Sequence, residues 1–253
     1  MASAHSRRTR LLELLADRGR IDVEEAALAL DVSPATIRRD LDELARQQLL
    51  QRTRGGAVSA EVAYDLPLRY KAARAAAEKQ RIAGAAAALV EPGAVVGLNG
   101  GTTTTEVARE LAARPGLTVV TNAVNIAAEL TVRPTAKIVM TGGVARPHSY
   151  ELIGPLAAAT LDVLSLDLAI LGVDALDAGF GASAAHEGEA EINRLMAERS
   201  ARVVVVADAS KLGARAFARI CPVSRIAVLV TDSAAGEERL APFREAGLEI
   251  VLA

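Results

Sequence analysis

Small and polar residues that suit phosphate binding follow an apolar segment near the middle of the chain. The run Asn99-Gly100-Gly101-Thr102-Thr103-Thr104-Thr105 comes directly after residues 94–98 and opens a helical pattern. Glycines allow the backbone to approach a ligand closely, and the N–H groups at a helix N-terminus favour an anion. The pattern therefore predicts a phosphate-binding loop, with contacts from Gly101, Thr102, Thr103 and Thr104.

Further polar residues follow four other apolar segments in the same half of the chain. They are Asn122, the pair Gly142 and Gly143, Asp174, and Lys211. Lys211 would meet a phosphate as a point charge, whereas Asn122 and Asp174 would bind sugar hydroxyls. Each residue alone fits a tight turn, a helix cap or a solvated side chain. Because five segments end in this way, we predict one shared ligand site.

The first 59 residues carry a different chemistry, that of a helix with outward-facing arginines. Ser33 is a good helix cap, and Pro34 suits the first helical position because its missing N–H costs nothing there. Ile37, Leu41 and Leu44 recur at helical spacing and are expected to face a core. The outer faces then carry Ala35, Thr36, Arg38 and Arg39.

A helix of this kind could read DNA. Its N-terminal residues would meet base edges, where an arginine can pair with guanine O6 and N7. The basic turn Arg52-Thr53-Arg54-Gly55-Gly56 predicts a β-hairpin that reaches phosphates or the minor groove. The predicted DNA contacts are Arg7, Arg8, Ser33, Ala35, Thr36, Arg38, Arg39, Arg52 and Arg54. The alternative is a small helical bundle with solvated arginines, which would not require these features in this order.

Two helices are expected before this one. The first spans about residues 6–17 and ends at Gly19. The second begins at Asp22, a good N-cap, with Glu25 three residues later as in a capping box. Its expected core residues are Ala26, Ala27, Leu28 and Leu30.

Beyond residue 90, apolar segments alternate with helical patterns. Strands are expected at 94–98, 117–121, 137–141, 168–172, 202–207 and 226–231, and helices at 104–113, 124–130 and 187–200. Continuous apolar strands separated by helices indicate a parallel sheet covered on both faces. Ligands bind such sheets at the carboxyl ends of the strands, where the polar residues lie. The predicted fold class is α/β, with a doubly wound, mostly parallel sheet.

The sequence resembles the DeoR family of bacterial repressors over nearly the whole chain. The N-terminal resemblance lies in Val32-Ser33-Pro34-Ala35-Thr36-Ile37-Arg38-Arg39-Asp40-Leu41 and in Arg54-Gly55-Gly56-Ala57. The C-terminal resemblance lies in Gly101-Thr102-Thr103, Thr121-Asn122, Gly142-Gly143, Gly154, Glu189-Ala190, Asp208 with Ser210-Lys211, and Thr231-Asp232. It implies a winged helix-turn-helix, followed by an effector domain similar to ribose-5-phosphate isomerase that senses phosphorylated sugars.

The expected organisation follows from the patterns and the resemblance together. Residues 1–59 form the winged helix-turn-helix, 60–75 a linker, and 76–253 the effector domain. An alanine-rich helix is expected from about Leu68 to Leu89. The expected function is repression of a carbohydrate catabolic operon, relieved by a phosphorylated sugar. The expected partners are double-stranded operator DNA, the effector, and further copies in a homodimer or homotetramer.

Two other functions deserve comparison. A sugar-phosphate isomerase with an appended helical domain would need a proton-transfer residue, but the stretch similar to the enzymes' acidic string is Leu171-Gly172-Val173-Asp174-Ala175. Leu171 cannot move a proton. A DNA-binding architectural protein would not need the polar residues after the strands. We therefore expect a site that binds without turnover, hence no enzyme.

The composition and the absence of certain motifs argue against several other classes of protein and binding site. The single cysteine, Cys221, cannot form an internal disulfide and fits a reducing, cytoplasmic setting. The sequence has no run of 18 apolar residues and no phosphate-loop or dinucleotide motif, so neither a membrane span nor a cofactor is expected. The three histidines are too far apart in sequence to suggest a metal site. Residues 1–59 hold 10 basic and 9 acidic side chains, a net +1 within a chain of net −2.

Overall fold

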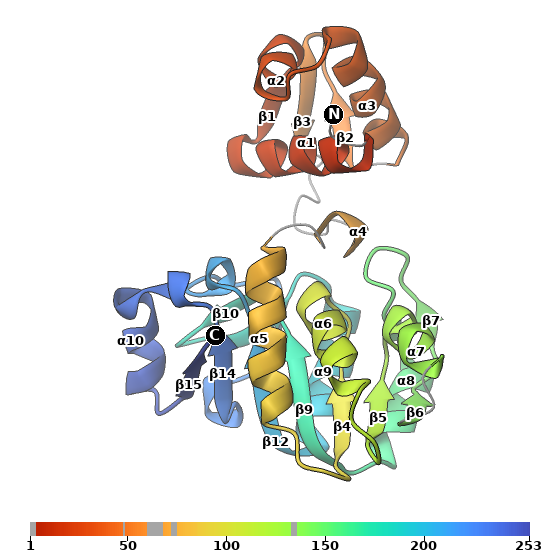
Figure 1. Ribbon diagram of the computed structural model, residues 1–253, viewed down its shortest axis with the longest axis vertical. Coiled ribbons are helices and arrows are strands. Elements are labelled where there is room, and N and C mark those ends of the chain that lie inside the picture. The colour runs from red at the N-terminus through yellow and green to blue at the C-terminus, as the bar shows by residue number, and fades with distance from the viewer. Residues whose placement is uncertain (1–3, 48, 60–67, 72–74, 133–135) are drawn as a thin grey trace. The chain divides into compact units, whose positions relative to one another are not determined.

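The computed structural model describes residues 4–47, 49–59, 68–71, 75–132 and 136–253 (Figure 1). The chain divides into two compact units, residues 1–74 and residues 75–253. The predicted boundary at 59/60 and most of the predicted linker lie outside the described residues. Each unit is therefore described by itself.

The N-terminal unit combines three helices with a small antiparallel sheet. Its elements are α1 (Ala4–Arg18), β1 (Arg20–Asp22), α2 (Val23–Ala29), α3 (Pro34–Arg46), β2 (Leu50–Arg52) and β3 (Gly56–Ser59). The sheet order is β1-β3-β2, so the predicted hairpin gains a third strand that the sequence reading missed. Asp22 ends β1 and also caps α2, accepting hydrogen bonds from the N–H groups of Glu24 and Glu25.

The core of this unit confirms the expected inward face of α3. Ile37, Leu41 and Leu44 are completely buried. In α2 the prediction was wrong for Leu28, whose side chain is 86% exposed. The helix has only 7 residues and buries the face that carries Val23, Ala26 and Ala27, so the adjacent position points outward. Leu30, just past the helix, packs partly against the core.

The predicted continuous helix over 68–89 was also wrong. The structure has α4 (Leu68–Lys71) and α5 (Ala76–Ala88) as separate helices. Ala75 has a left-handed backbone, with φ of 51°, immediately before α5. A right-handed helix cannot run through a residue in that conformation.

The C-terminal unit is built on a seven-stranded sheet in which every pairing is parallel. Its strands are β4 (Val95–Leu98), β5 (Thr118–Thr121), β6 (Lys137–Met140), β9 (Leu166–Gly172), β12 (Ser200–Val206), β14 (Val228–Thr231) and β15 (Glu249–Leu252). The order is β15-β14-β12-β9-β4-β5-β6. This confirms the predicted doubly wound α/β fold, and β15 is the edge strand that the sequence reading missed.

Helices cover both faces of the sheet. They are α5, α6 (Thr102–Leu111), α7 (Val124–Thr131), α8 (Pro155–Asp162), α9 (Glu187–Glu198) and α10 (Glu237–Glu245). In β12, Val204 and Val206 join the cluster under α5, α6 and α7, whereas Val203 and Val205 join the cluster under α8, α9 and α10. Figure 1 shows α5 and α6 in front of the sheet and α9 behind it. Burial of both faces explains why the strands read as continuous apolar runs.

Two smaller elements complete the unit. A second sheet has the order β10-β11-β13, formed by β10 (Ala175–Asp177), β11 (Gly181–Ala184) and β13 (Ala218–Cys221). A hairpin joins β7 (Val144–Ala145) to β8 (Leu152–Ile153). Short 3₁₀ turns lie at Ala209–Lys211, Val223–Arg225 and Ser233–Ala235. Among the helices that the structure describes, none is long and apolar enough to span a membrane.

Candidate DNA-binding face and effector site

Helix α3 presents a polar N-terminal face to solvent. The Ser33 hydroxyl caps the helix by accepting the Thr36 N–H at 3.2 Å, and it lies 2.9 Å from the Thr36 hydroxyl. Ala35 is exposed in the same turn, and Arg38 and Arg39 are exposed further along the helix. The predicted cap is thus confirmed, and the residues expected to reach bases share one accessible surface.

The arginines of this face differ in their intramolecular partners. Arg38 forms an ion pair with Glu24 of α2 at 3.1 Å, and both side chains are more than half exposed. Exposed pairs contribute little to stability, so Arg38 can exchange Glu24 for a DNA group at small cost. Arg39 makes no ion pair with any residue that the structure describes.

The predicted β-hairpin forms between β2 and β3. Its turn is closed by the Thr53 N–H, which donates to the Gly56 carbonyl at 3.1 Å. Arg52 pairs with Asp42 of α3 at 2.8 Å and donates to the same Gly56 carbonyl, which ties the hairpin to the helix. Arg54, at the tip, is exposed. The hairpin and α3 are therefore joined by side-chain contacts and both carry arginines.

Arg7 and Arg8 have a structural partner that the sequence did not reveal. Their guanidinium groups donate to the two carboxylate oxygens of Asp40, at 2.5 Å and 2.9 Å. The Asp40 side chain is 3% exposed, and those of Arg7 and Arg8 are 14% and 29% exposed. Both arginines thus fasten α1 to the inner side of α3, and DNA contact by them stays a prediction.

The candidate effector site lies where the chain reverses its direction of winding in the large sheet. From β4 the chain adds β5 and β6 in order toward one edge of the sheet. It then returns to the other side of β4 and adds β9, β12, β14 and β15 in order toward the opposite edge. In open α/β sheets, ligands bind at the carboxyl ends of the strands at such a switch point. Here Asn99, which follows β4, donates to the Gly172 carbonyl at 2.9 Å and accepts the Gly172 N–H at 2.8 Å.

The predicted phosphate-binding loop begins directly after Asn99. Gly101 has φ of 148° and caps α6 without any side-chain hydrogen bond, so its conformation favours glycine. Thr104 is fully buried, and its hydroxyl donates back to the Gly101 carbonyl. Gly101 and Thr102 are partly exposed, and Thr103 is 7% exposed. Gly101 and Thr102 are therefore accessible to an anion, whereas Thr103 is nearly buried and Thr104 shapes the loop.

The β7–β8 hairpin brings further groups to this loop. Its Glu151 side chain packs so closely on Gly100 that a Cβ atom there would lie 2.4 Å from the Glu151 Cγ. The hairpin also joins the end of β5, since the Leu152 N–H donates to the Asn122 carbonyl. Asn122 is fully buried, and its Oδ1 has no hydrogen-bond partner among the described residues.

The other predicted effector residues follow neighbouring strands. Asp174 follows β9 and accepts the Ala185 N–H at 2.9 Å, which fixes the start of the small sheet. Lys211 follows β12, the strand beside β9, and is partly exposed. Gly142 and Gly143 follow edge strand β6, two strands from the switch point. A Cβ at Gly143 would lie 2.6 Å from the Ile153 carbonyl, so this glycine is needed for packing.

Sequence reasoning missed Arg146, Glu151 and the partner role of Glu189. Arg146 donates to Glu189 of α9 at 2.8 Å, and both side chains are largely buried. Arg146 and Glu151 lie in an irregular hairpin without strand or helix periodicity, so no pattern marked them. His186 is the N-cap of α9 and accepts the Gly188 N–H at 3.1 Å.

A helix-turn-helix unit with a β-hairpin, followed by an α/β unit with a candidate ligand site at its switch point, is the arrangement expected of a ligand-responsive DNA-binding regulator. Family models agree: residues 7–63 match the DeoR-like helix-turn-helix domain, and residues 74–233 match the DeoR C terminal sensor domain. The chain belongs to the DeoR family of transcriptional regulators, as the sequence resemblance indicated.

Curated relatives are similar over most of their lengths. The putative aga operon transcriptional repressor of Escherichia coli O157:H7 is 34% identical over 97% of this chain and 93% of its own. The HTH-type transcriptional regulator GlpR of Haloferax volcanii is 35% identical, covering 97% of this chain and 96% of its own. The glycerol-3-phosphate regulon repressor of Escherichia coli is 34% identical over 88% of each chain. These relatives are named as regulators, not enzymes, and Leu171 is completely buried in the core.

Solved structures show more distant likeness. The probable sor operon regulator from Shigella flexneri is 18% identical, with a TM-score of 0.45 over 65% of this chain and 88% of its own. Ribose 5-phosphate isomerase A from Methanocaldococcus jannaschii is 20% identical, with a TM-score of 0.41 over 54% of each chain. The family assignment rests on the sequence comparisons.

Proposed function

We propose that this regulator represses a carbohydrate catabolic operon and is released from its operator by a phosphorylated sugar. The observation that carries the effector proposal is the pair of buried polar atoms beside the glycine loop. Asn122 Oδ1 and Glu151 Oε2 have no hydrogen-bond partner among the described residues. Buried polar groups are nearly always paired, so such atoms point to a missing ligand or water. Two relatives carry names that refer to glycerol-3-phosphate and to the aga operon.

The proposed effector contacts come from the loops after β4, β5, β9 and β12. The phosphate would bind the backbone of 101–104, with Lys211 as a cation, and Asn122 and Asp174 would bind sugar hydroxyls. Gly142 and Gly143 would shape the wall of the site. The proposed units are those of the sequence analysis: 1–59 for DNA, 60–75 as linker and 76–253 for the effector. Binding would bias the DNA-binding state by about 1–3 kcal/mol, the usual range of allosteric coupling.

A thermal-shift screen against phosphorylated sugars tests the effector proposal, followed by operator-release assays with the compounds that stabilise the protein. Lys211→Ala is expected to lose the release response while binding operator normally. Lys137→Ala is the matched control, because Lys137 is exposed on β6 at the opposite side of the switch point from β12. A Lys211→Ala protein that responds as well as the control would show that the effector phosphate does not bind at Lys211.

The DNA contacts are proposed for the exposed residues of α3 and the hairpin. They are Ser33, Ala35, Thr36, Arg38, Arg39, Arg52 and Arg54. Arg38→Ala is expected to weaken operator binding by roughly 1–3 kcal/mol, about 5- to 150-fold in Kd, and to relax specificity at one base pair. Arg46→Ala is the control, because Arg46 is exposed at the other end of α3 and pairs with Glu43. Equal affinities of the two variants in gel-shift titrations would refute the assignment.

We further propose that the chain acts as a homodimer or homotetramer. Dimers of helix-turn-helix proteins place two recognition helices on repeated half-sites. Edge strand β6 and its neighbours α7, β7 and α8 expose apolar side chains, which is typical of surfaces that other chains cover. These are Val132, Met140, Val144, Leu156 and Val163. Met140→Lys combined with Val163→Asp should lower the mass found by sedimentation equilibrium, whereas an unchanged mass would place the interface elsewhere.

A further inference from the structure

The most unusual side chain in the C-terminal unit is the carboxyl group of Glu151. It is 2% exposed, yet its Oε2 has no hydrogen-bond partner among the described residues. The backbone around it is well fixed: Arg146 N–H donates to the Glu151 carbonyl at 2.8 Å, and an isolated bridge pairs Glu151 with Ala123. The burial of the carboxyl is therefore built into the fold.

Neighbouring groups decide the charge of this carboxyl. Burial raises the pKa of Glu151 well above its ordinary range, and the negative charges of Glu189 and Asp174 raise it further. Hydrogen bonds from the Gly100 backbone and the Asn122 side chain act in the opposite direction but do not prevail. The cation of the hairpin, Arg146, is already paired with Glu189. Burial and the acidic neighbours therefore favour the neutral, protonated form of the Glu151 carboxyl.

The position of this acid gives it a use. It packs on Gly100, next to the loop that opens α6, so it lies against the backbone proposed to receive a phosphate. An ionised carboxylate there would repel an anion strongly, because the repulsion between like charges grows as their distance and the dielectric constant fall. A neutral carboxylic acid carries an O–H group and can instead donate a hydrogen bond.

We propose that Glu151 is a specificity-determining residue of the effector site, which donates a hydrogen bond from its neutral carboxyl to an oxygen of the anionic effector. The inference rests on the proposed function and adds a donor that no sequence motif marks. It explains how an acidic residue can lie beside a phosphate-binding loop. It also makes effector binding weaken as pH rises, because the acid ionises and the O–H donor becomes a repelling charge.

The test measures binding of inorganic phosphate, glycerol 3-phosphate and fructose 6-phosphate to the full chain between about pH 7.5 and 9.5. The two phosphate esters keep a nearly constant charge in this interval, because their second pKa is about 6. Inorganic phosphate still loses a proton near the lower limit, so the comparison across pH rests on the two esters. Wild-type affinity is expected to fall about tenfold or more as pH rises. Glu151→Gln keeps a neutral donor of the same shape, so it should bind as the wild type does at the lower pH, without the decline. Glu151→Ala should bind about tenfold more weakly or worse at the lower pH, since a bond to a charged group is lost.

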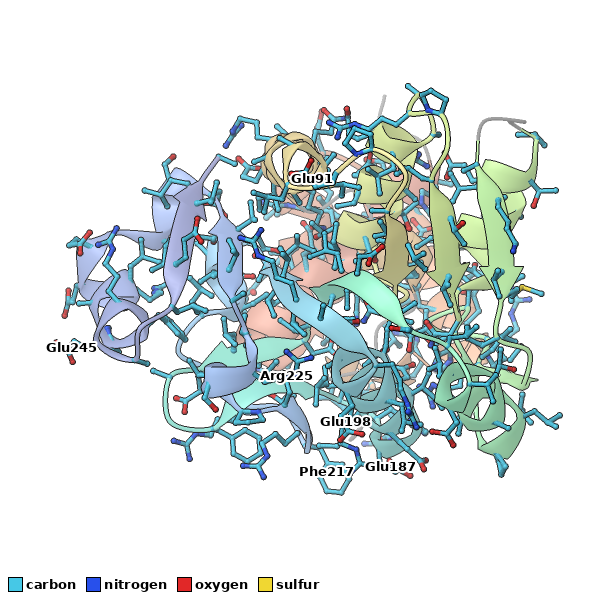
Figure 2. All side chains as sticks on the ribbon, turned by 90° about the horizontal axis from the view of Figure 1, so that it is seen from below. Glu91, Glu187, Glu198, Phe217, Arg225 and Glu245 are labelled. Carbon is cyan, nitrogen blue, oxygen red and sulfur yellow. The ribbon has the colours of Figure 1, made fainter. Side chains whose placement is uncertain are left out.

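Glu187→Gln serves as the control for a generic change of charge. Glu187 is the exposed first residue of α9, two positions before Glu189, and is labelled at the periphery of the unit in Figure 2. This variant should retain the wild-type affinity and its decline with pH. A Glu151→Gln protein that shows the same decline as the wild type would overturn the inference.

The outcomes separate this inference from the proposed function. If Lys211→Ala abolishes binding but Glu151→Gln and Glu151→Ala behave as the wild type, the effector site stands and the role of Glu151 is refuted. If none of the three compounds binds the wild type at any pH, the proposed function loses its support and the donor role falls with it. Nuclear magnetic resonance of the ¹³C-labelled glutamate carboxyls gives a ligand-free check. Titration of Glu151 at its ordinary pKa would overturn the inference by itself.

Discussion

Removal of the Asp40 carboxylate should destabilise the N-terminal unit strongly. Asp40 is 2% exposed and accepts hydrogen bonds from both Arg7 and Arg8. Breaking a buried ion pair by deleting one partner costs about 3–5 kcal/mol, because the remaining charge is left uncompensated. The two arginines are 14% and 29% exposed and can partly rehydrate, so we expect Asp40→Ala to lie near the lower end, about 3 kcal/mol.

Hydrogen exchange of the full chain resolves this effect, because it reports on each unit separately. Amides of α1 and α3 should exchange roughly 100-fold faster in Asp40→Ala, since 1.4 kcal/mol corresponds to a factor of about ten. Asp42→Ala is the matched control. Asp42 lies on the same helix and also pairs with an arginine, Arg52, but it is 61% exposed. Such a pair is worth about 0–1 kcal/mol. Similar exchange in the two variants would refute the structural role of the Arg7–Arg8–Asp40 cluster.

Three further outcomes test other parts of the structure. Gly56→Ala should destabilise the winged unit by at least about 1–3 kcal/mol in hydrogen exchange, because the new Cβ would lie 1.8 Å from the Ile21 carbonyl; Gly55→Ala, with an ordinary 3.6 Å contact, should not. Glu151→Gln should be more stable to urea than the wild type at neutral pH. The folded pKa of Glu151 is raised, so the wild type loses stability as pH rises above the unfolded value of about 4.3, and the difference should vanish below that pH. Cys221 should react with iodoacetamide only after unfolding, because burial raises its pKa to about 11.

Local signals were enough to predict the elements that carry the proposed DNA contacts. The Ser33 cap, Pro34 and the spacing of Ile37, Leu41 and Leu44 predicted α3, and the structure confirms its start and inner face. The sequence did not reveal contacts that depend on tertiary packing. Arg7 and Arg8 were predicted as DNA contacts, but their side chains pair with Asp40, which is 33 and 32 residues away in the chain, respectively. No local pattern reveals such a pairing.

For the effector site, too, local patterns predicted some features and only the folded structure revealed others. The apolar strands and the glycine loop at Gly101 followed from composition and period. Strand order, however, decided which of the strand ends lie together: the end of β4 adjoins those of β9 and β5, whereas Gly142 and Gly143 belong to edge strand β6. The sequence also predicted one helix over 68–89, which a left-handed Ala75 divides.

The sequence by itself determined the class of this protein, because a capped recognition helix, a basic glycine turn and alternating apolar strands depend on neighbours a few residues apart. Only the tertiary structure decided which charged groups surround the two buried acidic side chains, Asp40 and Glu151. Asp40 gains its arginines and Glu151 its acidic neighbours from distant segments. Burial and charge proximity are properties of the folded chain, since both depend on which segments exclude water from a side chain and which bring charges to it.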